Sequence, residues 1–236
     1  MPAEHIAKSF DDELGQLKVT LEEMGRLVQS QLQSSLLAIE QGDLKSAEKI
    51  IARDKEINRL NEAVDRQAVK LLALRQPMAV DLRLIVSSLR IASELERMGD
   101  YAANLAKRLR VIAEGRQAAR KVVKDTVALG NLVRMQITMA LHAMTQRNAD
   151  LARESWLHDS VIDENYSKLS TEIVELMKDD PNLVVPLTHF LFMIKNLERI
   201  GDHSTNIAEA VTFIVTGSRL IDAIKPTPAP KLAAAS

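Results

Sequence analysis

Hydrophobic residues recur at steps of three or four along most of the chain, which is the spacing of one face of an α-helix. The first series predicts a long helix that ends near Gln41–Asp43. A second series begins at Ala47 and stops ahead of Pro77, because proline disfavours helical backbone in the residue before it. A third series runs from Ala79 to about Gly115 with apolar residues on two faces, so we expect this helix to be central.

The same pattern then begins again, which indicates an internal repeat. A shift of 105 residues places Gln31 on Gln136 and Asp54 on Asp159 without a gap. After a shortening by three residues near Asp179, a shift of 102 residues aligns two further strings, Leu95-Glu96-Arg97-Met98-Gly99-Asp100 and Leu197-Glu198-Arg199-Ile200-Gly201-Asp202. Each half is therefore predicted to form three long helices.

The repeat predicts an all-α protein made of two three-helix bundles in tandem. Residues 1–115 would form the first bundle and residues 116–223 the second. Residues 224–236 are rich in proline and alanine, so we expect them to form a tail that does not pack against the bundles.

Composition agrees with helices and excludes several classes of protein. Aromatic residues make up only 3% of the 236 residues, and eight glycines and seven prolines are too few for the turns of a sheet protein. The chain has no cysteine, which excludes disulfides and thiolate metal sites. Its 31 basic and 32 acidic residues leave no overall positive field for nucleic acid. Without a signal sequence or a run of 18 apolar residues, we expect a cytoplasmic protein.

Acidic residues stand where the hydrophobic series calls for apolar ones. The second helix of the first half has Asp54 at such a position, and the second helix of the other half has its copy, Asp159. In the third helix, acids four residues apart share one helical face. These pairs are Glu96 with Asp100 and Glu198 with Asp202.

Like charges at this spacing repel, and burying them is costly unless a cation compensates. One candidate is a hard divalent or trivalent metal ion, which prefers carboxylate oxygens and is often bound between the helices of a bundle. The other is a set of salt bridges to nearby basic residues, of which Arg97 and Arg199 lie inside the motifs and Arg53 and Lys55 flank Asp54. The residues alone leave both explanations open.

Signatures of enzymes are missing from the sequence. The five histidines do not form a metal-binding set, and no Glu-x-x-His pair of the kind used by di-iron bundles occurs. Glycine-rich phosphate loops, dinucleotide fingerprints and hydroxyl nucleophiles beside a histidine base are absent as well. An oxidase or hydrolase is therefore disfavoured.

Taken together, the strings resemble a known family. Glu94-Leu-Glu-Arg-Met-Gly-Asp100 and Leu197-Glu-Arg-Ile-Gly-Asp202 occur with Arg75-Gln-Pro-Met-Ala-Val-Asp-Leu-Arg83 and Arg53-Asp-Lys-Glu-Ile-Asn58. This combination resembles the PhoU family of bacterial phosphate transport regulatory proteins, over residues 5 to 220. The resemblance implies two three-helix bundles related by pseudo-twofold symmetry.

The resemblance also implies a role without enzymatic activity. A member would restrain phosphate uptake and hold the phosphate-starvation response off when phosphate is plentiful. It would bridge the ATPase subunit of the phosphate ABC transporter (PstB) and the sensor histidine kinase PhoR. A homodimer is implied too, with membrane association only through these partners and no nucleic-acid partner.

Metal binding belongs to the same resemblance. Members bind iron, zinc, manganese or magnesium through their acidic motifs, which gives the following candidate ligands here: Asp54, Glu96 and Asp100 in the first half, and Asp159, Asp163, Glu198 and Asp202 in the second. Asn58 stands where the second half has Asp163, so equal occupancy of the two sites is in question. Two alternatives remain, a structural helical scaffold without metal and a carboxylate-bridged metal oxidase.

Overall fold

A computed structural model describes residues 2–112 and 119–220, with side chains from residue 10 onwards. Within these ranges the protein contains seven α-helices, one short 3-10 helix and no strand. The predicted all-α class and the two tandem helical bundles are confirmed. No helix in the described ranges has the length and apolar character needed to cross a membrane.

The first half forms three long helices, as predicted: α1 (Pro2–Gln41), α2 (Leu44–Arg75) and α3 (Ala79–Ile112). The break after α1 comes at Gly42, whose φ of 73° is the left-handed backbone that glycine adopts readily. Asp43 then caps α2, because its carboxylate accepts hydrogen bonds from the backbone N–H groups of Lys45 and Ser46. The predicted ends of the first two helices are therefore confirmed, whereas the predicted end of the third, near Gly115, lies outside the described residues.

The second half repeats this course with one difference. It consists of α4 (Arg120–Gln146), α5 (Ala149–Leu157), α6 (Asp159–Asp179), the 3-10 helix η1 (Pro181–Leu183) and α7 (Val184–Thr216). The counterpart of α2 is divided into α5 and α6 at His158, where the sequence predicts one long helix.

Gln136 explains this break. Its side-chain Nε2 donates to the backbone carbonyl of Ser155 at 3.3 Å, the carbonyl that would otherwise accept from the Asp159 N–H in a continuous helix. A side chain that enters the helical hydrogen-bond series in this way is a common cause of a kink. Gln31, the counterpart of Gln136, donates to the carbonyl of Gly99 instead, and α2 stays continuous.

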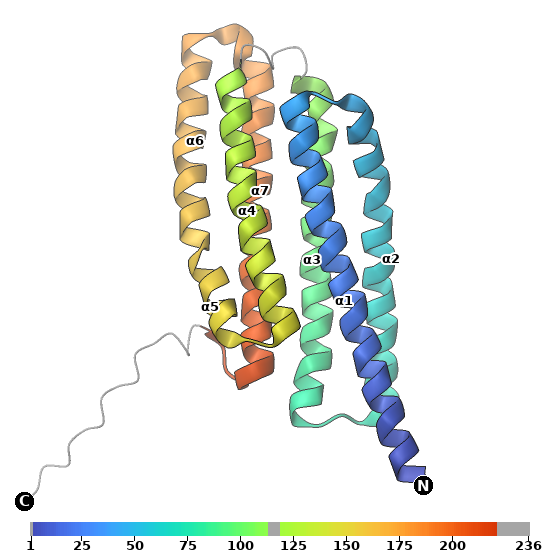
Figure 1. Cartoon of the computed structure of the whole chain (residues 1–236). Helices are drawn as coiled ribbons and strands as arrows, with labels where there is room; N and C mark the ends of the chain where they lie inside the picture. Colours follow the sequence, from blue (N-terminus) through green and yellow to red (C-terminus); the bar gives the residue numbers. More distant parts are fainter. Residues whose placement is uncertain (1, 113–118, 221–236) are drawn as a thin grey trace, which may run out of the picture.

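The two halves lie side by side with their helices roughly aligned (Figure 1). Helix α3 packs against α1, α2 and α7, and the α3–α7 contact is the most extensive between any two helices. The expected central position of the third helix is therefore confirmed.

A reciprocal contact between α1 and α4 marks the pseudo-twofold relation of the halves. A Cβ atom on Gly25 would lie 2.7 Å from Leu141 Cδ2, and one on Gly130 would lie 2.3 Å from Leu36 Cδ2. Each glycine therefore makes room for the leucine of the other half, and the shift of 105 residues exchanges the two contacts.

Two parts of the expected domain organisation lie outside the described residues. The boundary between residues 115 and 116 falls within residues 113–118, and the expected tail, residues 224–236, falls within residues 221–236. These boundaries stay predictions.

Two candidate carboxylate clusters

The first cluster joins Asp54 of α2 to Glu96 and Asp100 of α3, and all three residues are partly buried. Close contact between the two helices brings them together. Ile57 is fully buried against Gly99, where a Cβ atom would lie 2.8 Å from Ile57 Cδ1 and 3.4 Å from Asp54 Oδ1. Glycine at this position therefore lets α2 approach α3 closely enough for the acids to meet.

The acids of the first cluster repel one another. Burial raises the pKa of Asp54, and the Asp100 carboxyl raises it further despite a hydrogen bond from Gln31. Burial also raises the pKa of Glu96, with Asp100 again the next cause. Among the described residues no lysine or arginine forms an ion pair with any of the three acids. A salt-bridged network thus does not account for this cluster.

The second cluster joins Asp159 and Asp163 of α6 to Glu198 and Asp202 of α7. Asp159 is partly buried and the Glu198 side chain is only 13% exposed, whereas Asp163 and Asp202 lie at exposed positions. Burial raises the pKa of Asp159, as do Asp163 and Glu198. Partial desolvation, followed by the charges of Glu198 and Asp159, raises the pKa of Asp202 to about 6.

Two buried glutamines that were not predicted from the sequence as site residues belong to these clusters. Gln31 is 2% exposed and donates through Nε2 to Asp54 Oδ1 at 3.3 Å, and Gln136 is 0% exposed and donates to Asp159 Oδ1 at 3.1 Å. In both residues the Oε1 atom is buried and has no hydrogen-bond partner in the part of the chain that the structure describes. The sequence repeat could have indicated these two residues, because it aligns Gln31 with Gln136 on the apolar face of the first helix of each half.

A lysine distinguishes the second cluster from the first. Lys195 Nζ donates to Glu198 Oε1 at 2.6 Å, and Glu198 is the main reason that the pKa of Lys195 is raised. The corresponding residue of α3, by the shift of 102, is Ser93. The second cluster thus contains one salt bridge of the kind expected for a scaffold, while the first contains none in the described residues.

The structure therefore gathers every acid that the sequence nominated into one of two groups. As the side chains stand, no three His, Cys, Asp or Glu residues in the described ranges converge closely enough to hold a metal ion. The chemistry of the donors is nevertheless suitable, since carboxylate and amide oxygens are the ligands that hard cations prefer. Metal binding would require rotation of some of these side chains.

His203, which follows Asp202 in α7, makes a different contact. Nδ1 of His203 in α7 lies 2.5 Å from Oε2 of Glu94 in α3, and Asn206 Nδ2 donates to the same oxygen at 3.0 Å. Burial alone would favour the neutral acid, but these two hydrogen bonds hold the pKa of Glu94 below its ordinary value. This contact joins the two halves and lies outside both clusters.

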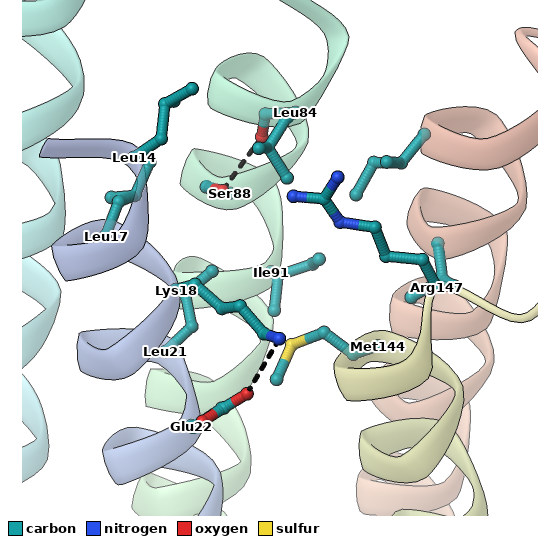
Figure 2. Close-up of a pocket in the computed structure, with 12 residues that line it drawn as sticks. Leu14, Leu17, Lys18, Leu21, Glu22, Leu84, Ser88, Ile91, Met144 and Arg147 are labelled. Atoms are coloured by element: carbon teal, nitrogen blue, oxygen red, sulfur yellow. Dashed lines mark hydrogen bonds and ion pairs between the residues drawn. The ribbon is translucent and has the colours of Figure 1, made fainter. Parts of the chain in front are cut away.

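An apolar pocket between the halves is separate from the clusters. Leu17, Ile91 and Met144 contribute to its lining from α1, α3 and α4, and α7 closes it (Figure 2). Arg147, which follows α4, points into this pocket from a left-handed backbone with φ of 49°. Gly42 occupies the corresponding position of the first half, with φ of 73°.

Comparison with known proteins decides the family. The PhoU domain model matches the chain twice, over residues 21–109 and 126–211, which agrees with the internal repeat. The chain belongs to the PhoU family. Both carboxylate clusters lie within the two matched segments.

Relatives within the PhoU family cover nearly the whole chain. A phosphate-specific transport system accessory protein PhoU homolog of Caulobacter vibrioides is 38% identical over 217 residues, which are 92% of this chain and 94% of that protein. A homolog of the same name from Xylella fastidiosa is 39% identical and covers 92% of this chain and 89% of its own length.

Solved PhoU structures share the fold. The crystal structure of PhoU from Pseudomonas aeruginosa superposes with a TM-score of 0.84 at 33% identity, covering 89% of this chain and all of that one. The phosphate transport system regulatory protein PhoU from Streptococcus pneumoniae gives a TM-score of 0.82 at 34% identity, covering 89% of this chain and 98% of that one.

Proposed function

We propose that this protein is a non-enzymatic negative regulator of phosphate uptake and of the phosphate-starvation response. It acts as an adaptor between the ATPase subunit of the phosphate ABC transporter (PstB) and the sensor histidine kinase PhoR. The observation that carries the proposal is membership of the PhoU family over both halves, with relatives named as accessory proteins of phosphate transport. We further propose a cytoplasmic homodimer that reaches the membrane only through these partners.

We also propose that each half holds metal through its carboxylate cluster. Asp54, Glu96 and Asp100 would supply oxygens in the first half, as would Asp159, Asp163, Glu198 and Asp202 in the second. A bound cation would relieve the mutual repulsion that helps to raise the carboxyl pKa values, and would offer a partner to the buried Oε1 atoms of the two glutamines. Iron, zinc, manganese and magnesium all accept such oxygen ligands.

Deletion of the gene tests the regulatory role. In medium rich in phosphate, loss of the protein should raise expression of phosphate-responsive genes such as alkaline phosphatase, and the intact gene supplied in trans should restore repression. Unchanged expression would refute the regulatory proposal. Copurification of the intact protein with PstB and with the PhoR kinase tests the adaptor role separately, since a regulator that acts otherwise would capture neither.

Elemental analysis of protein purified without a histidine tag tests metal binding. Intact protein should contain at least stoichiometric metal, and the double substitution Asp54→Asn with Asp100→Asn should remove the share held by the first half. Asp65→Asn, an exposed aspartate of α2 outside both clusters, is the matched control and should retain all of it. Metal below one equivalent in the intact protein would favour the structural scaffold.

A carboxylate-bridged metal oxidase is the enzymatic alternative. Such an enzyme would consume oxygen when loaded with iron, whereas we expect no consumption above that of free iron. In the described residues no histidine forms a hydrogen bond or ion pair with an acid of either cluster, which favours an adaptor over an oxidase.

A further inference from the structure

Two of the differences between the clusters of the two halves compensate in charge. Asp163 of the second half corresponds to Asn58 of the first, and both lie at exposed positions of their helices. Lys195 of the second half corresponds to Ser93 of the first. The second cluster therefore has four carboxylates and one ammonium group bonded to Glu198, and the first has three carboxylates and no bonded ammonium group, so these groups alone sum to three minus in both.

Equal charge does not make the clusters equivalent for a cation. The second cluster already contains one positive charge, because Lys195 Nζ lies 2.6 Å from Glu198 Oε1. The Glu198 side chain is 13% exposed, whereas Asp202 is exposed. Solvent therefore screens the attraction of Lys195 to Glu198 less than its attraction to Asp202. A cation that approaches Glu198 must either displace the ammonium group or bind beside it.

Displacement of Lys195 is physically accessible. Its side chain is 42% exposed, so the ammonium group can move out into solvent when it leaves Glu198. The ring of Tyr166 lies 5.3 Å from the Lys195 nitrogen and could hold the ammonium group by a cation–π contact after it leaves Glu198. Lys195 therefore opposes a cation without blocking it.

Two buried oxygens of the second cluster, one on Gln136 and one on Glu198, have no hydrogen-bond partner among the described residues. Gln136 is fully buried, and no described residue forms a hydrogen bond with its Oε1 atom. This atom lies 3.1 Å from the place of a Cβ atom on Gly201. Glu198 Oε2 is likewise buried and has no partner within residues 2–112 and 119–220, while Oε1 of the same carboxylate is bonded to Lys195. Buried oxygens of this kind are costly unless a donor or cation satisfies them.

We propose that Lys195 is an internal competitor for cations that lowers the affinity of the second cluster, so that the first cluster fills at lower metal concentration and the second fills later. The proposal rests on the metal binding proposed above and assigns the order of occupancy within it. It reverses the order suggested by the acid count alone, in which Asp163 would favour the second cluster.

Titration calorimetry with Mn²⁺ on the full chain, at constant pH and ionic strength, tests this order. The intact protein should show two classes of site. Lys195→Ser should tighten the weaker class about tenfold, the effect of one unit charge on a divalent ion about 6 Å away in a medium as polar as water. Lys195→Gln, which keeps most of the stem, should do the same. Ser93→Lys, the reciprocal change at an exposed position of α3, should weaken the tighter class by a similar factor.

Double substitutions assign the classes to the clusters. Asp54→Asn with Asp100→Asn should abolish the tighter class, and Asp159→Asn with Asp202→Asn should abolish the weaker one. Two classes that are unchanged by Lys195→Ser and Lys195→Gln would refute the competitor role while leaving metal binding intact. Absence of Mn²⁺ binding in the intact protein and all variants would instead refute the proposed metal sites, and the order of occupancy with them.

Discussion

Asp202 offers a direct test of the electrostatics of the second cluster, because Asp202→Asn removes one of its charges while keeping the shape of the side chain. Desolvation and the charges of Glu198 and Asp159 raise the pKa of Asp202 from the ordinary 3.8 to about 6. A carboxyl whose pKa is higher in the folded than in the unfolded state favours folding when it is protonated. The contribution of Asp202 to stability is therefore complete below about pH 4 and is lost as the pH rises through about 6.

The size of this effect follows from the same pKa values. One pKa unit corresponds to about 1.4 kcal/mol, so the full difference between 3.8 and about 6 would correspond to roughly 3 kcal/mol. Asp202 lies at an exposed position, where solvent screens much of this interaction. We therefore expect Asp202→Asn to raise the free energy of unfolding by about 1 kcal/mol at pH 7.5 in metal-free protein.

Urea unfolding followed by circular dichroism, in the presence of a chelator, measures this difference. The gain at pH 7.5 should disappear at pH 4, and Asp65→Asn on α2 should change the free energy of unfolding by less than about 0.5 kcal/mol at either pH. Added Mn²⁺ should reverse the ranking at pH 7.5, since the variant lacks a proposed ligand. A variant that is less stable than the intact protein in chelator at pH 7.5 would show that the Asp202 carboxylate is favourable in the fold and would refute the reasoning.

Three other variants test contacts outside the clusters by the same unfolding assay. Gly130→Ala should destabilise the protein by about 1–2 kcal/mol, because the new Cβ would overlap Leu36. Leu36→Ala should then lower the free energy of unfolding less in the Gly130→Ala variant than in the intact protein. Arg147→Gly should stabilise by about 1 kcal/mol by relieving the positive φ, and an unchanged melting temperature would contradict this. Glu94→Gln should destabilise by about 1–2 kcal/mol at pH 7 through its weaker bond to His203; because the Glu94 pKa is lowered, this loss should shrink below pH 4, and a loss independent of pH would contradict it.

Most of the fold could be predicted because helical periodicity and punctuation are local properties of the sequence. The ends of α1 and α2 follow from Gly42 and from the proline at position 77, and the repeat gives the number of bundles. The break at His158 could not be predicted in this way. It depends on the Gln136 side chain, which comes from another helix and takes a carbonyl of α5. The same glutamine has a counterpart in Gln31 that leaves α2 unbroken, so residue identity alone does not decide the outcome.

The acids of the site could be predicted for a related reason, and their neutralising partners could not. A carboxylate on an otherwise apolar helical face is visible from the sequence, as Asp54 and Asp159 are. Whether a lysine three residues before Glu198 reaches that acid or extends into solvent depends on its surroundings, and Tyr166 of α6 is one of these. The partner of each acid is therefore a property of the assembled bundle.

The change of offset between the halves shows what sets the geometry of the clusters. The second half is three residues shorter between its upstream aspartate and its third-helix motif, yet Asp159 meets Glu198 and Asp202 as Asp54 meets Glu96 and Asp100. The missing residues fall near the turn at the end of α6, far along the helix from Asp159. At the second cluster, Ile162 Cδ1 lies 3.4 Å from the place of a Cβ atom on Gly201. At the first cluster, Ile57 Cδ1 lies 2.8 Å from the place of a Cβ atom on Gly99. Because these contacts fix the register of the two helices, the connection can change length without moving the acids apart, and a substitution of either glycine should disturb the clusters more than a change in the length of the turn.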